Sequence, residues 1–387
     1  MKFLLYDWEA LTQKGLIKAL EKLGHTVVWY NRKIENHILD EPFIRDLAVK
    51  LATDGIDVVI SFNFFSQVSL ACQAMKKIYL SWIYSCPHYY METGAAYYEG
   101  NFFFVFDRNY ANYFIQKGFP NVYHLPLAVD PEVFEHTEPL DRRYGYDVSF
   151  VGSLYANEKN YFDQIMGLSD FWKGYVDGLC EAQSKIYGYD LIRANLNQEL
   201  VQELKRLVKF DVEKDMTLGF EEFLIGIIQK KVTIMERSRY LDALSKQYET
   251  ALFTKLSNPN EADALKDIIL CKQVKYYEEM PEVFRQSKIN LNISLRSITS
   301  GIPLRVLDIM GCGGFLLTNY QEEIAECFED RKDLVMWGSQ EELIDLCGYY
   351  LTHEEERKQI ARNGYEKVCR DFSYDVQVQK MLRVISE

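Results

Sequence analysis

The stretch Lys288–Thr318, KINLNISLRSITSGIPLRVLDIMGCGGFLLT, carries the strongest structural signal in the chain. An apolar run is followed by a polar loop with Ser300 and Gly301, a helix that begins at Pro303, a Gly-Gly pair and a second apolar run. Proline suits the first turn of a helix, and glycine suits its end. The pattern predicts a strand–loop–helix–strand unit of an α/β sheet.

This unit has the features of an anion site. The N–H groups at the start of the helix have no partner within the helix, and they point toward the region above the sheet. Arg296 and Arg305 flank the loop, and Asp308 lies one turn beyond Arg305 on the same helix face. Guanidinium groups suit a diphosphate, and a carboxylate suits two ribose hydroxyls, so the unit indicates a nucleotide-sugar pocket. The alternative is an ordinary α/β unit in which Arg305 and Asp308 form a surface ion pair.

Composition limits the class of protein. The 387 residues exceed a typical single domain, which favours two domains. The net charge of −13 argues against non-specific binding of nucleic acid and against a broad basic membrane surface. No apolar run approaches the roughly 20 residues that span a bilayer, and no signal peptide is evident after Met1. The eight cysteines contain no C-x-x-C pair. We therefore expect a cytoplasmic protein without a structural metal.

The first half of the chain alternates strand-like and helical segments, which predicts a parallel, doubly wound sheet. The expected strands are Lys2–Tyr6, Thr26–Tyr30, Val58–Phe62, Ile78–Trp82, Phe102–Phe106 and Val122–Leu125. Residues 126–143, rich in Pro, Asp and Glu, read as a linker. A second set of strands is expected at Asp147–Val151, Val274–Tyr277, Ile289–Ile293, Phe315–Thr318 and Leu334–Met336.

Residues from about 157 to 271 form an insertion with helical spacing, for which we expect several packed helices. The insertion either caps the sheet or extends the surface for a substrate. The end of the chain, Gln340–Glu387, is predicted to be helical, with interruptions near Gly364 and Ser373.

Segments in both halves resemble the CgeB-like (spore-maturation) branch of the group 1 glycosyltransferases. In the second half these are YDVSFVGSLY at 146–155, residues 294–318, and EELIDLCGYYLTHEEERKQIARNGYEKV at 341–368. In the first half they are DVVISFNFFSQVSLAC at 57–72, YLSWIYSCPH at 79–88, and FDRNYANYFIQKGFPNVYHLPLAVDPEVF at 106–134.

The resemblance implies the GT-B fold, in which two doubly wound Rossmann-like α/β domains face a cleft. It places an acceptor-side domain at residues 1–140 and a nucleotide-sugar domain at 141–370, with the helical insertion inside the latter. Residues 371–387 would form a helix that crosses back to the first domain. The implied reaction is metal-independent transfer of a sugar from a nucleotide-sugar, a UDP-sugar first of all, with retention of configuration. The implied acceptor is a protein or a cell-surface glycan.

On the nucleotide side, Gly152 and Ser153 follow an expected strand, where glycine lets the backbone approach a phosphate. The resemblance adds Lys159 as a basic residue and the loop residues Ser300 and Gly301. Tyr277 could frame the nucleobase, although a core or surface tyrosine is an equal alternative. The wider group has two glutamates eight residues apart around this loop, and here Ser300 and Asp308 stand at those positions.

On the acceptor side, Tyr6–Trp8, Asn63–Gln67 and Ser85–His88 each follow an expected strand and could meet at the cleft. His88 is the candidate acid, base or hydrogen-bond donor, and Arg296 and Arg305 are the candidate stabilisers of the leaving diphosphate. A structural role for His88 is the alternative. No D-x-D motif suggests a metal-bound diphosphate.

Two other functions remain open at this stage. A non-catalytic protein that binds nucleotide-sugars or assembles a spore or surface layer could keep the outline of the pocket. A sugar-nucleotide epimerase shares the two-domain architecture but needs carboxylates around the sugar, and Ser300 replaces one of them. The sequence does not indicate the sugar, the base or the oligomeric state.

Overall fold

The structure, a computed structural model, describes residues 1–386 except 11, 38, 133–144, 157–161, 163, 164, 166, 209, 211–216, 257 and 258. The chain divides into two compact units. Unit 1 comprises Met1–Ala128, Asp211–Gly219 and Phe372–Glu387, and unit 2 comprises Val129–Phe210 and Phe220–Asp371. The boundary predicted at residue 140 lies outside the described residues.

Unit 1 contains a parallel sheet of six strands in the order β2-β1-β3-β4-β5-β6. The central strands β3 and β4 are buried along almost their whole length because helices cover both faces of the sheet. Each predicted strand of the first half is confirmed within two residues. The bounds are β1 (Lys2–Tyr6), β2 (Thr26–Tyr30), β3 (Val58–Phe62), β4 (Ile78–Ile83), β5 (Asn101–Val105) and β6 (Val122–His124).

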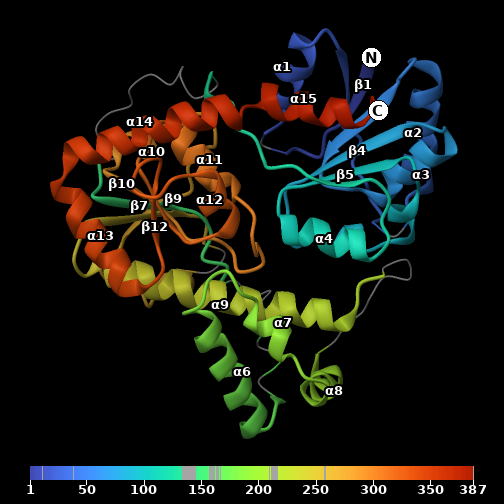
Figure 1. Ribbon diagram of the computed structural model, residues 1–387. Coiled ribbons are helices and arrows are strands. Elements are labelled where there is room, and N and C mark those ends of the chain that lie inside the picture. Colours follow the sequence, from blue (N-terminus) through green and yellow to red (C-terminus); the bar gives the residue numbers. More distant parts are fainter. Residues whose placement is uncertain are drawn as a thin grey trace. The chain divides into compact units, whose positions relative to one another are not determined.

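Helices lie on both faces of this sheet (Figure 1). α2 (Glu41–Thr53), α3 (Ser66–Ala74) and α4 (Arg108–Gln116) bury their apolar residues in one core cluster. α1 (Gln13–Lys22) packs with α15 (Tyr374–Val384), the last helix of the chain. Their contact depends on Gly15, since a Cβ there would lie 2.3 Å from a ring carbon of Tyr374. Short 3-10 helices occupy Tyr89–Met91 and Gly94–Tyr97.

Unit 2 contains a second parallel sheet, in the order β12-β11-β10-β7-β8-β9. The bounds are β7 (Val148–Val151), β8 (Thr250–Thr254), β9 (Ile269–Lys272), β10 (Ile289–Asn292), β11 (Leu316–Asn319) and β12 (Val335–Trp337). The two sheets confirm the predicted α/β class with two doubly wound units.

The prediction of a strand at Val274–Tyr277 is wrong. This segment forms an irregular stretch and a turn before α10 (Met280–Gln286), and a 3-10 helix occupies Pro259–Ala262. The sheet is completed instead by β8 and β9, which the sequence placed inside the helical insertion. β8, TALFT, is fully buried next to β7, so its neighbours in the sheet decide its conformation.

The remaining helices of unit 2 cover its sheet from both sides (Figure 1). α10, α11 (Leu304–Gly311) and α14 (Glu354–Asp371) lie on one face, and α9 (Phe220–Ser245) and α13 (Gln340–Thr352) lie on the other. α12 (Glu322–Cys327) follows β11. Among the described residues, no helix combines the length and the apolar character needed to cross a membrane.

The insertion forms helices, as predicted. α6 (Asp170–Gln183), α7 (Leu191–Asn195) and α8 (Gln198–Leu207) share a core of their own with the first half of α9. The second half of α9 instead buries Tyr240, Leu241 and Leu244 in the core of the sheet. α9 therefore belongs both to the insertion and to the layer that covers the sheet.

The predicted interruption at Gly364 is also wrong. Gly364 lies inside α14, and the break in this region falls at His353, between α13 and α14. A Cβ at Gly364 would lie 2.4 Å from the carbonyl oxygen of Asp333 and 2.9 Å from Cε of Met310. The glycine thus permits close packing and does not end the helix.

Candidate functional site

The carboxyl ends of β7, β10 and β11 lie side by side because the three strands are parallel and hydrogen-bonded neighbours. Polar side chains join them there. The main-chain N–H of Ser294 donates to the side-chain oxygen of Asn319 at 2.8 Å, and the amide of Asn292 donates to the hydroxyl of Thr318 at 2.9 Å. In doubly wound sheets, ligands bind at this edge, so unit 2 offers its candidate site here.

Arg305 lies in the first turn of α11, near this edge. One of its terminal nitrogens, Nη1, donates to Asp308 at 3.1 Å and also contacts the sulfur of Met280. The Arg305 side chain is 27% exposed. α11 begins directly after Pro303. The first N–H groups of a helix have no partner within the helix. Arg305 and the start of α11 together can present positive charge to an anion.

Asp308 is buried beneath Arg305. Its two carboxylate oxygens accept separate bonds, one from Arg305 and one from the hydroxyl of Tyr276 at 2.6 Å. Burial raises the pKa of Asp308 to about 6, while Arg305 and Tyr276 act to lower it. A ribose could bind Asp308 only by sharing or replacing one of these two contacts. In this structure Asp308 positions Arg305 and Tyr276.

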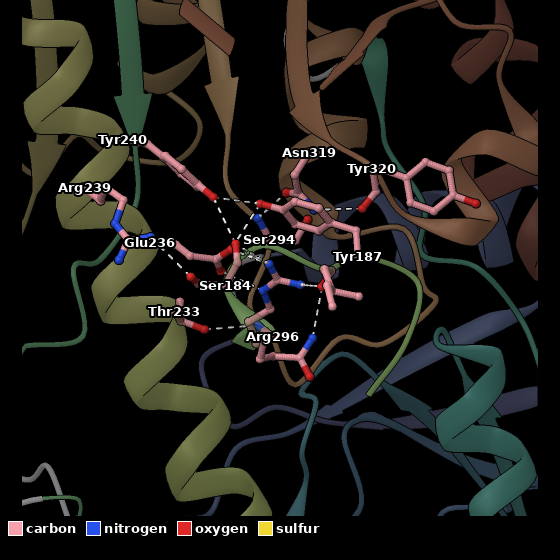
Figure 2. A network of polar contacts seen from close by, with 12 residues as sticks. Ser184, Tyr187, Thr233, Glu236, Arg239, Tyr240, Ser294, Arg296, Asn319 and Tyr320 are labelled. Carbon is pink, nitrogen blue, oxygen red and sulfur yellow. Dashed lines mark hydrogen bonds and ion pairs between the residues drawn. The ribbon is translucent and has the colours of Figure 1, made fainter. Parts of the chain in front are cut away.

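Arg296 occupies a different environment from Arg305, as Figure 2 shows. Its Nε donates to Glu236 of α9 at 2.7 Å, and Nη2 forms a second, very short bond to the same carboxylate. Nη1 donates to the carbonyl oxygen of Ile186 at 2.8 Å, and the guanidinium lies 4.0 Å from the ring centroid of Tyr187. Through these contacts, Arg296 attaches the insertion to the loop after β10.

The carboxylate that holds Arg296 is itself deeply buried. Burial raises the pKa of Glu236, and the charge of Arg296 and the hydroxyl of Tyr187 counteract this shift. Tyr187 donates to Glu236 at 3.1 Å, and its hydroxyl lies 3.2 Å from that of Tyr240 (Figure 2). Arg296 and Arg305, which the sequence grouped as two diphosphate contacts, thus have separate surroundings.

The loop with Ser300 and Gly301 is anchored to α12. The Ser300 hydroxyl donates to a carboxylate oxygen of Glu323 at 2.7 Å, and its carbonyl oxygen accepts the main-chain N–H of Glu323 at 3.0 Å. Ser300 and Glu323 are both buried. The sequence showed no carboxylate at position 300, but the fold places one beside it.

The remaining predicted residues on this side are placed as follows. Gly152 and Ser153 lie directly after the carboxyl end of β7. Tyr277 lies in the turn before α10, with its ring 5.0 Å from that of Tyr276 in an edge-on arrangement. Lys159 lies outside the described residues.

In unit 1, His88 is buried behind the carboxyl ends of β3 and β4. Its Nε2 lies 3.1 Å from the main-chain nitrogen and 3.0 Å from the main-chain oxygen of Phe64. Its own main-chain N–H donates to the hydroxyl of Tyr110 at 2.9 Å. Burial lowers the pKa of His88 to about 4, so the ring is neutral at pH 7. This geometry favours a structural role over acid–base work at a substrate.

The acceptor-side segments that follow β1, β3 and β4 do meet at one edge of the sheet. The side-chain oxygen of Asn63 accepts the main-chain N–H groups of Tyr84 and Ser85, at 2.9 and 3.1 Å. The indole N–H of Trp8 donates to the carbonyl oxygen of Phe62 at 2.7 Å, and 41% of Trp8 remains exposed. These contacts fix polar and aromatic groups at an edge where ligands commonly bind.

Comparisons with known proteins identify the class of the molecule. A protein-family model described as "Glycosyl transferase-like" matches residues 240–383, a range that contains Arg296, Arg305 and Asp308. The chain has the GT-B fold, and residues 240–383 are similar to this glycosyl transferase-like family. No curated protein is similar enough to this chain to count as a match.

Solved structures share the fold of this chain over nearly its whole length. Sucrose-phosphate synthase from Thermosynechococcus elongatus has a TM-score of 0.58 at 9% identity, covering 100% of this chain and 98% of that one. The Anabaena protein HepE, in complex with UDP and glucose, has a TM-score of 0.58 at 11% identity, covering 100% and 99%. A Listeria monocytogenes protein proposed to be a UDP-N-acetylglucosamine 2-epimerase has a TM-score of 0.51 at 12% identity, covering 99% and 95%. At these identities the likeness concerns the fold alone.

Three residues of interest were not found from the sequence. Glu236 and Arg237 lie in the run MERSRY at 235–240, which shows only helical spacing. Glu323 lies in an acidic first helical turn, where a carboxylate normally faces solvent. The partners of all three are distant in sequence, so no local pattern indicated them.

Proposed function

We propose that this protein is a glycosyltransferase that moves a sugar from a nucleoside-diphosphate sugar, with a UDP-sugar as the first candidate, to a hydroxyl of a protein or a cell-surface glycan. In this reaction the bond from the anomeric carbon to the diphosphate breaks, and a bond to the acceptor oxygen forms. Negative charge grows on the leaving diphosphate, and the enzyme must stabilise it.

The observation that carries the proposal is the position of Arg305. It is a partly exposed guanidinium in the first turn of α11, held by a buried carboxylate at the ligand-binding edge of a parallel sheet. A carboxylate partner that fixes an arginine lowers the cost of orienting it toward a phosphate. We assign to Arg305 the contact with the leaving phosphate, and to the backbone of Gly152, Ser153 and Gly301 the remaining approach to the diphosphate.

Further parts of the proposal rest on other observations. Metal independence rests on the absence of a D-x-D motif in the sequence and on Arg305 as an alternative source of positive charge. Retention of configuration and membership of the CgeB-like branch rest on the resemblance of the quoted segments. A nucleobase contact from Tyr277 rests on its place beside Tyr276.

An epimerase is the competing reaction, since the fold is shared with a protein proposed to be one. The carboxylate of Glu323 beside Ser300 favours this alternative, because epimerisation needs acid–base groups around the sugar. A transferase leaves free nucleoside diphosphate as a product, whereas an epimerase converts one nucleotide-sugar into its epimer.

The experiment that decides between the two reactions is a screen of UDP-, GDP-, ADP- and dTDP-sugars with the purified protein, followed by chromatography of the nucleotide products. Release of a nucleoside diphosphate, faster in the presence of an acceptor glycan or protein, supports transfer. Conversion to an epimeric nucleotide-sugar without release of the diphosphate contradicts it. Binding without either product would favour the non-catalytic alternative.

A further inference from the structure

Arg237 of α9 is buried at the point where two strands of the second sheet end. Its Nη1 donates to the carbonyl oxygen of Ser153, after β7, and its Nη2 donates to that of Ile293, after β10, at 2.6 Å. The guanidinium lies 5.2 Å from the ring centroid of Phe150 and 5.1 Å from that of Tyr155. Only 7% of Arg237 is exposed. The insertion helix therefore delivers a positive charge to the carboxyl ends of β7 and β10.

This charge is not compensated by an ion pair within the described part of the chain. Glu236, its sequence neighbour, is bound to Arg296, and among the described residues no carboxylate lies within ion-pair distance of Arg237. The Nε of Arg237 is buried and has no hydrogen-bond partner there. A buried charge without an ion pair is costly to a fold. At a candidate ligand site, an anionic ligand can lower this cost.

Charges of both signs act on Arg237. Burial holds its pKa at about 10, below the usual 12.5, while Tyr155 and Glu236 act to raise this pKa and the positive charge of Arg305 acts to lower it. Arg237 is nevertheless charged at pH 7. A Cβ at Gly152 would lie 3.8 Å from its Nη1, so the backbone that follows β7 runs directly beside the guanidinium. Glu236 is also the ion-pair partner of Arg296, so one carboxylate faces two buried guanidinium groups, and this surplus of positive charge favours an anion at the adjoining edge.

We infer that Arg237 is a positioning residue for the diphosphate of the sugar donor. The inference rests on the proposed function. Arg237 braces the loops after β7 and β10 through their carbonyl oxygens, and its buried charge raises the affinity of the adjoining edge for a diphosphate. Because Arg237 is buried, it acts on a diphosphate at a distance and not by direct contact.

The physical reason lies in the low dielectric around the guanidinium. A charge surrounded by Phe150 and Tyr155 is screened less than one in water, so it acts on a nearby diphosphate over a greater distance. The charge is also fixed before the ligand arrives, so no reorganisation is required as the leaving group forms. On this basis the helical insertion is a part of the donor site, through α9, and not a cap alone.

The test compares two substitutions that both break the brace but differ in charge. Arg237→Lys keeps the charge and cannot reach both carbonyl oxygens, whereas Arg237→Gln removes the charge. The affinities of UDP and of uridine are measured by calorimetry for each variant and the unaltered protein. Arg239→Gln is the control, because Arg239 lies on the same helix, two residues on, and pairs with the partly exposed Glu181.

We expect Arg237→Gln to weaken the binding of UDP by about tenfold or more, because the buried charge near the diphosphate is lost, with little change for uridine. Arg237→Lys should keep most of the affinity for UDP, and Arg239→Gln should keep all of it. Equal losses in Arg237→Gln and Arg237→Lys, or equal losses of UDP and uridine, would overturn the role of the charge.

Two further outcomes are distinct. If the unaltered protein binds UDP and Arg237→Gln binds it equally well, the inference fails and the proposed function stands. If the unaltered protein binds no nucleoside diphosphate, the proposed function fails and the inference fails with it. Should Arg237→Gln not fold, Arg237→Met replaces it, because its side chain suits the aromatic surroundings. If neither neutral variant folds, the charge of Arg237 is required for stability, and this result also overturns the inference.

Discussion

Glu236 and Arg296 form a buried ion pair that joins α9 of the insertion to the loop after β10. The carboxylate is held by two guanidinium nitrogens and by the hydroxyl of Tyr187 (Figure 2). The pair explains why Arg296, which the sequence grouped with Arg305, has its guanidinium bound within the protein. It also makes the attachment of the insertion to the sheet sensitive to single substitutions.

Arg296→Ala should lower the free energy of unfolding by about 3–5 kcal/mol, because it leaves Glu236 charged, buried and unpaired. Urea denaturation of the variant measures this loss. Arg193→Ala is the matched control, since Arg193 pairs with Glu222 on the surface, where a pair contributes about 0–1 kcal/mol. Replacing both members, Glu236→Leu with Arg296→Leu, should cost less than Arg296→Ala alone. A stable Arg296→Ala variant that loses affinity for UDP would instead restore Arg296 as a ligand contact.

Arg305→Ala should abolish most transfer activity while the fold survives. Loss of a charge-assisted contact to the leaving phosphate costs about 2–4 kcal/mol of transition-state stabilisation, by analogy with lost oxyanion donors. The fold tolerates the change because Asp308 keeps its bond from Tyr276 and can take up a proton, its pKa being about 6 already. Turnover at saturating donor and a thermal melt provide the measurements, with the exposed Arg206→Ala as control. If the variant turns over like the unaltered protein, Arg305 does not contact the leaving phosphate and serves only as the ion-pair partner of Asp308.

Asp308 should make stability fall with rising pH. Its pKa is raised from 3.8 to about 6, so the folded state holds the proton more tightly than the unfolded state. The resulting stabilisation is complete below pH 3.8 and is lost as the pH rises through 6. The difference in free energy of unfolding between the unaltered protein and Asp308→Asn should decrease by on the order of 1 kcal/mol between pH 5 and 7.5. Urea titrations of both proteins at several pH values measure it. A difference that grows with pH would mean that Arg305 and Tyr276 dominate over burial.

The role of Asp308 toward ribose can be tested with the same variant. The sequence predicts that Asp308→Asn weakens UDP strongly and 2′,3′-dideoxy-UDP hardly at all. Since both carboxylate oxygens are bound within the protein, we expect similar losses for both ligands, transmitted through Arg305. A cycle of two protein forms and two ligands measures the coupling directly. A loss confined to UDP would establish the ribose contact and require Tyr276 or Arg305 to move on binding.

Transfer activity should survive treatment with EDTA. The expectation follows from the absence of a D-x-D motif and from the place of Arg305 at the start of α11. The measurement is donor turnover before and after chelation and dialysis. Loss of activity with recovery on addition of Mn²⁺ or Mg²⁺ would indicate a metal-bound diphosphate.

The sequence by itself determined the fold class and most of the strands. The largely apolar runs of β1 and β3 have few conformational alternatives once a parallel sheet is buried on both faces. Pro303 and the glycine pair after α11 marked the bounds of that helix through backbone preferences alone. The position of Arg305 in the first turn follows from the same local rules. All of these features depend on residues that are close together in the chain.

Only the tertiary structure decided which charged groups are available to a ligand. Arg296 and Arg305 look alike in sequence, yet one is bound to a glutamate 60 residues away and the other is partly exposed. Arg237 carried no local signal, and its place at the ends of β7 and β10 results from the path of α9 across the sheet. β8 was read as helix for a related reason, since its strand conformation comes from pairing with β7. Hydrophobic periodicity reports which face is buried, whereas the partner of a polar side chain is set by contacts between distant segments.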